Sequence, residues 1–153
     1  MDYMEVVEEP KKQYIVVKIG SEQYGIDISY IDNIVRMQKI TRVPTSQFYF
    51  LGVINLRGEV IPVMSIRRKM GLADDVYTGA SRIIILKIDQ KDALGIVVDE
   101  VREVINLGTS DIEKVSHNAS DSKEMFINGI GKNGEELVSL FDINAIIDEH
   151  EGA

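Results

Sequence analysis

The sequence predicts a mainly β protein in which two small β-barrels pack together, with only short helices added. Ile and Val total 38 residues whereas Leu and Ala total 14, and β-branched side chains favour strands. The apolar stretches are short and separated by tight turns, which excludes a parallel βαβ arrangement with its long crossovers. The pattern also occurs twice along the chain. Closing each sheet into a barrel would remove edges that promote aggregation.

The first half begins with a strand over 14–19, followed by a turn and a second strand over 24–28. The second strand alternates apolar and polar residues, as a half-buried strand does. From Ile28 the apolar spacing changes to threes, through Ile31 and Ile34, which indicates one helical turn before the chain extends again.

The second half repeats this order. The matched segments are 85–88 with 16–19, 94–98 with 24–28, 101 and 104 with 31 and 34, 129–130 with 52–53, 133–135 with 57–59, and 140–143 with 63–66. A β-rich chain could show such matches by chance. The matched glycines and the shared change of period favour a true duplication.

These boundaries divide the chain into a flexible lead-in over 1–12, one domain over 13–147 and an acidic tail over 148–153. The two subdomains correspond approximately to the sequence halves 13–77 and 82–147. The sequence leaves open whether strands are exchanged between the two lobes.

Three short helical segments are expected. The first covers 62–72 and ends in a basic turn and a glycine. The second has one or two turns, and Ser110 and Glu113 have the spacing of a capping box at its start. The third covers 143–149, with Asp142 as its N-cap.

The residues that carry catalysis are scarce. The chain has no cysteine, which excludes disulfides, thiolate nucleophiles and sulfur-based zinc sites. Its two histidines, His117 and His150, lie in polar stretches and are expected to be solvated. The segment 129–134 matches G-x-G-x-x-G, but Asn133-Gly134 is expected to form a type I′ hairpin turn rather than to open a helix. We therefore expect no enzyme activity, no cofactor and no metal, and a binding module instead.

The formal net charge is -8, from 17 basic and 25 acidic residues. Phosphate binding needs a basic surface, so nucleic acid is not an expected partner. No apolar run is long enough to span a bilayer, and residues 1–12 do not read as a signal peptide. The expected location is the cytoplasm.

Three segments then resemble CheW-like proteins, the adaptors of bacterial chemotaxis: Tyr24-Gly25-Ile26-Asp27-Ile28, Gly52-Val53-Ile54-Asn55-Leu56-Arg57-Gly58 and Gly95-Ile96-Val97-Val98-Asp99. The resemblance extends from about Tyr14 to Ile147. It implies two SH3-like, five-stranded β-barrel subdomains. It also implies a non-enzymatic adaptor that joins the cytoplasmic tips of transmembrane chemoreceptors to the regulatory domain of the histidine kinase CheA, recruited to receptor arrays at the inner face of the membrane.

The resemblance further implies partner-binding positions. From the N-L-R-G motif these are Asn55, Arg57 and Gly58, and from the groove between the lobes they are Ile31, Asn33, Val101 and Val104. Many members of the family have glutamate where this chain has Asn33, so a charge-assisted contact there is lost.

Other interpretations stay open. Arg57 could be an ordinary exposed hairpin residue, and Ile31, Val101 and Val104 could simply be core. Gly52 is expected to be a backbone requirement in a crowded strand. Alternative functions are an adaptor of a related chemosensory kinase array with another output, or a small-ligand-binding β-barrel protein.

Overall fold

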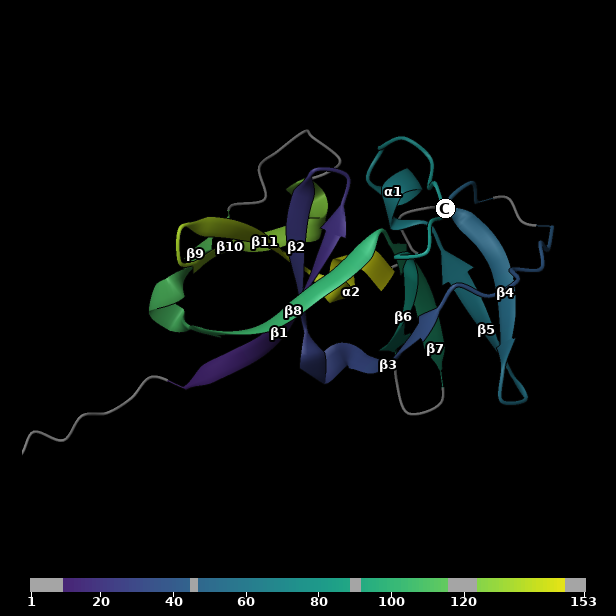
Figure 1. Ribbon diagram of the computed structural model, residues 1–153, viewed down its shortest axis with the longest axis horizontal. Coiled ribbons are helices and arrows are strands. Elements are labelled where there is room, and N and C mark those ends of the chain that lie inside the picture. The colour runs from purple at the N-terminus through teal and green to yellow at the C-terminus, as the bar shows by residue number, and fades with distance from the viewer. Residues whose placement is uncertain (1–9, 45–46, 89–91, 116–123, 148–153) are drawn as a thin grey trace, which may run out of the picture.

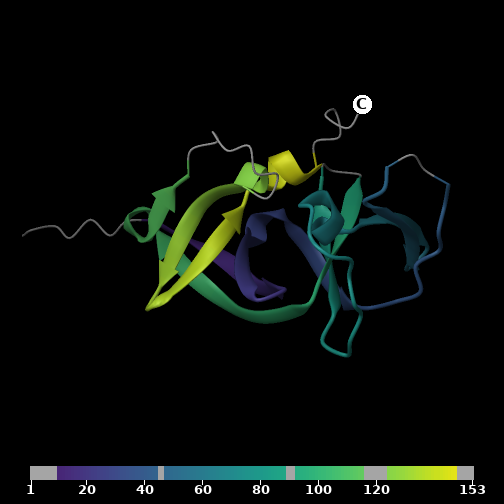
Figure 2. The same cartoon turned by 90° about the horizontal axis from the view of Figure 1, so that it is seen from above.

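The computed structural model describes residues 10–44, 47–88, 92–115 and 124–147, which form two curled sheets side by side (Figures 1 and 2). Lobe 1 is a six-stranded sheet in the order β8-β1-β2-β11-β10-β9, and lobe 2 is a five-stranded sheet in the order β3-β6-β7-β5-β4. The strands are β1 (Lys11–Ile19), β2 (Glu22–Asp27), β3 (Ile31–Arg36), β4 (Phe50–Leu56), β5 (Glu59–Met64), β6 (Arg82–Lys87), β7 (Ala93–Val98), β8 (Glu100–Gly108), β9 (Ile112–Lys114), β10 (Ile127–Asn133) and β11 (Glu136–Phe141). The helices are η1 (Ile28–Tyr30), α1 (Ile66–Lys69), η2 (Thr109–Asp111), η3 (Glu124–Phe126) and α2 (Ile143–Ile147).

The mainly β prediction with two packed lobes and short helices is confirmed. Lobe 1 has six strands rather than the expected five, because the short strand β9 pairs with β10. The strand β1 begins at Lys11, inside the expected lead-in over 1–12. Residues 1–9 and the expected tail over 148–153 lie outside the described residues.

The two lobes exchange strands. The β1–β2 hairpin of the first half sits in lobe 1 with β8 to β11, while the β6–β7 hairpin of the second half sits in lobe 2 with β3 to β5. Each exchanged hairpin joins its lobe through a short parallel pairing, in which Gly25 faces Leu140 and Gly95 faces Val63. These positions are equivalents in the sequence repeat, so the exchange is reciprocal. Each lobe therefore draws strands from both 13–77 and 82–147.

The strand registers match the repeat residue by residue. In lobe 2, Ile31 pairs with Leu86, and in lobe 1 the equivalent Val101 pairs with Val17. Both pairings contain a register shift nearby. The β4–β5 and β10–β11 hairpins also shift register just before the equivalent glycines, Gly52 and Gly129. Matching irregularities in both halves are strong evidence for a duplicated unit, because bulges are specific features of a sheet.

Three apolar clusters hold this arrangement together. One fills lobe 1, one fills lobe 2, and a larger central core lies between them. Along β6, Ile83 and Ile85 face the lobe 2 cluster, whereas Ile84 and Leu86 face the central core. Successive residues of a strand point to opposite faces, so the exchanged strands are apolar on both faces. This explains their uninterrupted apolar runs.

The expected helix over 62–72 is wrong at its start. Residues up to Met64 belong to β5, because Ile61 and Val63 point alternately into the lobe 2 cluster. The helix α1 begins only at Ile66, after Ser65, whose hydroxyl oxygen accepts a hydrogen bond from the Arg68 N–H at 3.1 Å. A serine N-cap of this kind fixes the start of a helix.

Of the other two predicted helix caps, one is wrong and one is confirmed. The expected cap pair Ser110 and Glu113 is wrong, since Glu113 lies in β9 and it is Asp111 Oδ2 that accepts a hydrogen bond from the Gly108 N–H at 2.8 Å. The Asp142 cap of α2 is confirmed, because its Oδ1 accepts from the Ala145 N–H at 3.2 Å. Residues 148–149 of the expected third helix lie outside the described residues.

The second hairpin turn is also shifted by one residue. Strand β10 extends through Asn133, so the turn residues are Gly134 and Glu135. Only Gly134 has a positive φ, of 66°, which is typical of a type II′ turn and not the expected type I′. The G-x-G-x-x-G segment thus lies in a hairpin, as expected.

Candidate partner-binding surface

The two-residue turn between β4 and β5 has a strained backbone. Arg57 has φ 54° and Gly58 has φ 84°, which is the pattern of a type I′ turn. Arg57 is the single non-glycine residue with a positive φ among the residues that the structure describes. The left-handed region disfavours residues with a Cβ. An arginine kept in this conformation is a candidate functional residue.

The guanidinium of Arg57 points to no partner within the described part of the chain. The side chain is exposed and makes no hydrogen bond or ion pair there. Its neighbour Asn55 is also exposed, and across the hairpin it pairs with Val60, which is 66% exposed. The turn therefore presents a free five-donor fork beside an amide and an apolar side chain.

Sequence reasoning missed Val60. The signal that could have found it is the repeat, because Asn55 opposite Val60 corresponds to Lys132 opposite Leu137. Leu137 is likewise exposed, at 61%. An apolar residue exposed at the same place in both halves is less easily explained as a chance surface residue.

The groove candidates divide between core and surface. Ile31 and Val101 are half-buried and pack against the central core. Asn33 is half-buried, and its Oδ1 accepts a hydrogen bond from the Ile34 N–H at 2.8 Å. Val104 is 53% exposed on β8. The structure thus brings Ile31 and Val101 to one cluster, and places the Arg57 turn at the free end of the β4–β5 hairpin (Figure 1).

An ion pair ties the two lobes together next to the central core. Arg67 of α1 donates to Asp99 through Nη2 at 2.6 Å and through Nε at 3.3 Å. Asp99 Oδ2 also accepts from the Gly20 N–H at 2.8 Å, and the Asp99 N–H donates to the Lys18 carbonyl at 3.0 Å. Because Asp99 lies where the chain passes from lobe 2 to lobe 1, these bonds fix the relative position of the lobes.

A second acidic group under α1 is held in an unfavourable environment. Asp75 Oδ2 accepts from the buried Ser65 hydroxyl at 2.5 Å, while its Oδ1 is buried and has no hydrogen-bond partner among the described residues. Burial raises the pKa of Asp75 above its usual value, and the Ser65 hydroxyl and the Arg67 guanidinium only partly oppose this.

We expect Asp75→Asn to stabilise the protein near neutral pH. A carboxyl whose pKa is higher in the folded state stays protonated up to a higher pH there than in the unfolded state. Folding stability from Asp75 is therefore lost as pH rises through the window between its ordinary and its raised pKa. The amide removes that loss, and we expect a gain on the order of 1 kcal/mol. Urea unfolding at a series of pH values measures it. The exposed Asp74→Asn is the control, and identical pH profiles for wild type and Asp75→Asn would contradict the prediction.

Across 10–44, 47–88, 92–115 and 124–147, no cluster of His, Asp or Glu has the arrangement of a metal site. In the same ranges, no helix is long and apolar enough to cross a membrane. His117 and His150 lie outside these ranges. The described residues instead form two packed lobes with an exposed arginine turn and exposed apolar side chains, features that suit a protein-binding scaffold.

Comparisons with known proteins lead to the same class. The CheW-like domain family matches residues 13–151. The chemotaxis protein CheW of Bacillus subtilis is 33% identical, covering 90% of this chain and 88% of its own length. The CheW of Helicobacter pylori is 36% identical, covering 88% and 81%. The crystal structure of the scaffolding protein TtCheW from Thermoanaerobacter tengcongensis superposes with a TM-score of 0.78 at 30% identity, covering 87% of this chain and 90% of that one.

The chain belongs to the CheW-like domain family, and it is a non-enzymatic chemotaxis scaffold. The matched region spans both lobes and the exchanged strands, so the similarity applies to the whole described fold.

Proposed function

We propose that this protein couples transmembrane chemoreceptors to the histidine kinase CheA, as a cytoplasmic component recruited to receptor arrays. The partners are the cytoplasmic tip of the receptors and the regulatory domain of the kinase. The observation that carries the proposal is the Arg57 turn. An exposed arginine without a partner among the described residues occupies a costly backbone conformation there, within the segment that carries the family resemblance.

The remaining candidates suit a helical partner. A receptor tip is a helical coiled coil, and such a helix docks in an apolar groove with a polar rim. Ile31 and Val101 supply half-buried apolar surface at the central core, Val104 supplies exposed apolar surface, and Asn33 supplies a neutral polar group. The guanidinium of Arg57 is suited to a carboxylate of a partner.

Co-sedimentation of receptor-containing membranes with the kinase, with and without this protein, tests the proposal. The protein is expected to pellet with the membranes and to increase the amount of kinase in the pellet. If it binds neither the receptor nor the kinase, the proposal is wrong.

In the same assay we expect Arg57→Ala to weaken binding of receptor or kinase by about 1 kcal/mol or more, close to a fivefold loss. The fold should stay intact, because alanine carries the same Cβ as arginine and the turn keeps its conformation. Arg57→Gly removes the same guanidinium but also relieves the left-handed backbone, so it should unfold at a higher temperature than wild type, with a gain of about 1 kcal/mol.

These two variants separate function from stability. If Arg57→Ala and Arg57→Gly lose the same affinity for the receptor or the kinase although their stabilities differ, the guanidinium contributes to binding. Unchanged affinity of both variants for both partners would remove Arg57 from the site.

A further inference from the structure

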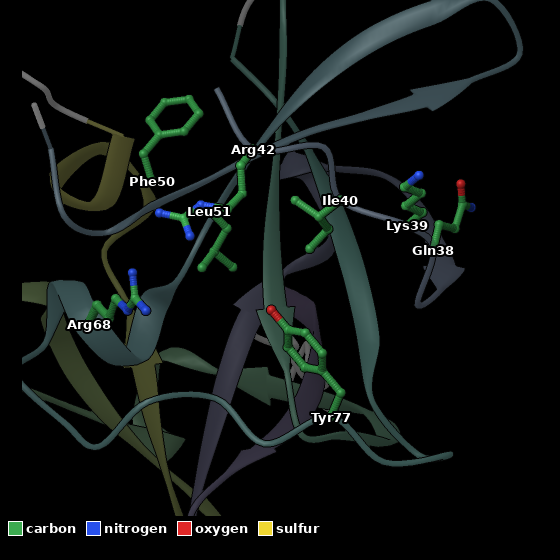
Figure 3. A pocket seen from close by; sticks show the side chains of 8 residues that line it. All are labelled: Gln38, Lys39, Ile40, Arg42, Phe50, Leu51, Arg68 and Tyr77. Atoms are coloured by element: carbon green, nitrogen blue, oxygen red, sulfur yellow. The ribbon is translucent and has the colours of Figure 1, made fainter. Parts of the chain in front are cut away.

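A basic groove lies on lobe 2, at the opposite end of β4 from the Arg57 turn. It consists of two adjoining hollows with volumes of about 440 and 300 Å³. They share a wall made of Arg42, Phe50, Leu51 and Arg68. Figure 3 shows the guanidinium groups of Arg42 and Arg68 beside Leu51, with Ile40 and Tyr77 facing them.

The charge of this groove is opposite to that of the protein. Its charged lining residues are Lys39, Arg42 and Arg68, and no described acidic residue lines either hollow, although the chain has a net charge of -8. Lys39 and Arg42 are exposed and make no ion pair within the described ranges. Two free cations next to a third favour an anionic ligand.

Arg68 is partly engaged inside the protein. Its Nε and Nη2 donate to the Asp74 carboxylate at 3.0 and 3.3 Å, and its Nη1 donates to the Phe48 carbonyl at 2.8 Å. The Asp74 side chain is 70% exposed, so this pair lies in water and is weak. A carboxylate entering the groove would compete with Asp74 for the same guanidinium.

The groove also carries apolar surface. Ile40, Phe50 and Leu51 are half-buried in its wall. At its outer end Phe48 is 67% exposed and Val43 is 39% exposed. A small anion would fill one hollow and leave these side chains uncovered, whereas an extended chain would lie across both hollows and cover them.

Tyr77 adds a hydrogen-bond donor. Burial raises the pKa of its phenol, and the nearby Asp75 carboxylate raises it further. A tyrosine hydroxyl is protonated at neutral pH even with its ordinary pKa, so it can donate to a carboxylate or to a peptide carbonyl.

We propose that the basic groove binds an extended acidic peptide segment of a partner protein, with an aromatic or aliphatic side chain of that segment seated against Phe50 and Leu51. Strand β4 has 7 residues, so its two ends are about 20 Å apart. The basic groove and the Arg57 turn are separate surfaces, and the proposal does not depend on the coupling of receptor and kinase.

The test uses the full chain and a synthetic library of random short peptides carried on beads. Peptides retained by the wild-type protein are expected to be enriched in Glu or Asp together with Phe, Tyr or Leu. A fluorescent copy of an enriched peptide then gives affinities by anisotropy. We expect Arg42→Glu to weaken binding at least tenfold. The control is Arg102→Glu, which makes the same change of charge at an exposed position on β8 and should leave the affinity within twofold of wild type.

Two further measurements sharpen the result. Asp74→Asn should strengthen binding, because it frees Arg68. Replacing the acids of the peptide by lysine should abolish binding, and inorganic phosphate should compete only at high concentration. The proposal is overturned if Arg42→Glu and Arg102→Glu bind equally, if the enriched peptides lack acids, or if phosphate competes as well as the free peptide does. The Arg57 variants should bind the peptide like wild type, so a failure here is distinguishable from a failure of the coupling function.

Discussion

Replacing Gly52 with alanine is expected to cost more than about 3 kcal/mol, a large part of the about 5–15 kcal/mol by which a domain of this kind is stable. A Cβ on Gly52 would lie 2.2 Å from the Thr41 carbonyl oxygen and 3.0 Å from the Arg42 Cα. Both obstacles are backbone atoms, so no side chain can move aside. The backbone of Gly52 also has φ 140°, which residues with a Cβ rarely adopt.

The close approach at Gly52 has a specific cause. Thr41 and Val53 exchange two backbone hydrogen bonds of 2.8 and 2.9 Å, which press the segment after β3 against β4. Relieving the clash would break these bonds and free the segment that forms one wall of the basic groove. The cost is therefore structural and extends beyond one residue.

Gly58→Ala is the matched control for Gly52→Ala. Gly58 also has a positive φ, of 84°, but a Cβ there would meet nothing within 4 Å. Its cost should be limited to the left-handed backbone, about 1–2 kcal/mol. Chemical denaturation of both variants measures the difference. Equal losses of stability would show that backbone conformation, and not the clash with Thr41, decides the effect.

The second large effect is expected at the ion pair between the lobes. Asp99→Ala leaves the Arg67 guanidinium, whose side chain is only 15% exposed, without its carboxylate. It also leaves the Gly20 N–H without its acceptor. Removing one partner of a fully buried pair costs about 3–5 kcal/mol. Because Asp99 is 27% exposed, we expect about 1–3 kcal/mol.

The pair between Arg68 and Asp74 gives a matched comparison on the same helix. It has the same chemistry, but Asp74 is 70% exposed, so Asp74→Ala should change stability by at most about 0.5 kcal/mol. A double-mutant cycle on Arg67 and Asp99, followed by urea unfolding, isolates the coupling between them. A coupling no larger than that of the exposed pair would show that the contact does not hold the lobes together.

The sequence predicted best those features of the structure that depend on residues close together in the chain. Asp142 caps α2 because its side chain needs only the N–H three residues ahead. The apolar alternation placed the strands of the first hairpin, and the repeat correctly paired the two halves. Registers confirm this pairing, since Val104 faces Ile15 as Ile34 faces Ile84.

Local patterns failed where a neighbouring element decides the outcome. The expected helix over 62–72 loses its start because the β4–β5 pairing extends to Met64. The turn predicted at Asn133-Gly134 moves by one residue because β10 continues to pair through Asn133. In both cases a gain in cross-strand pairing outweighs a local preference.

The candidate site shows the same division. The N-L-R-G segment pointed to Arg57, but two of its features became visible only in the folded hairpin: its left-handed backbone, and its lack of a partner in the part of the chain that the structure describes. Val60 and the basic groove were not anticipated, because the groove brings Lys39 and Arg42 against Arg68 and Tyr77 from well-separated parts of the chain.

By itself, the sequence determined that this protein is a duplicated, strand-rich domain without a catalytic apparatus of the usual kinds. Residue composition, the apolar spacing within each short segment and the recurrence of that spacing in the second half are all visible without knowing which segments touch. Only the tertiary structure decided how the halves exchange their hairpins and which surfaces remain open. The physical reason is that Gly25 beside Leu140 and Gly95 beside Val63 are long-range contacts. These contacts are stabilised by burying both faces of the exchanged strands, and no local pattern in the sequence specifies which lobe each hairpin joins.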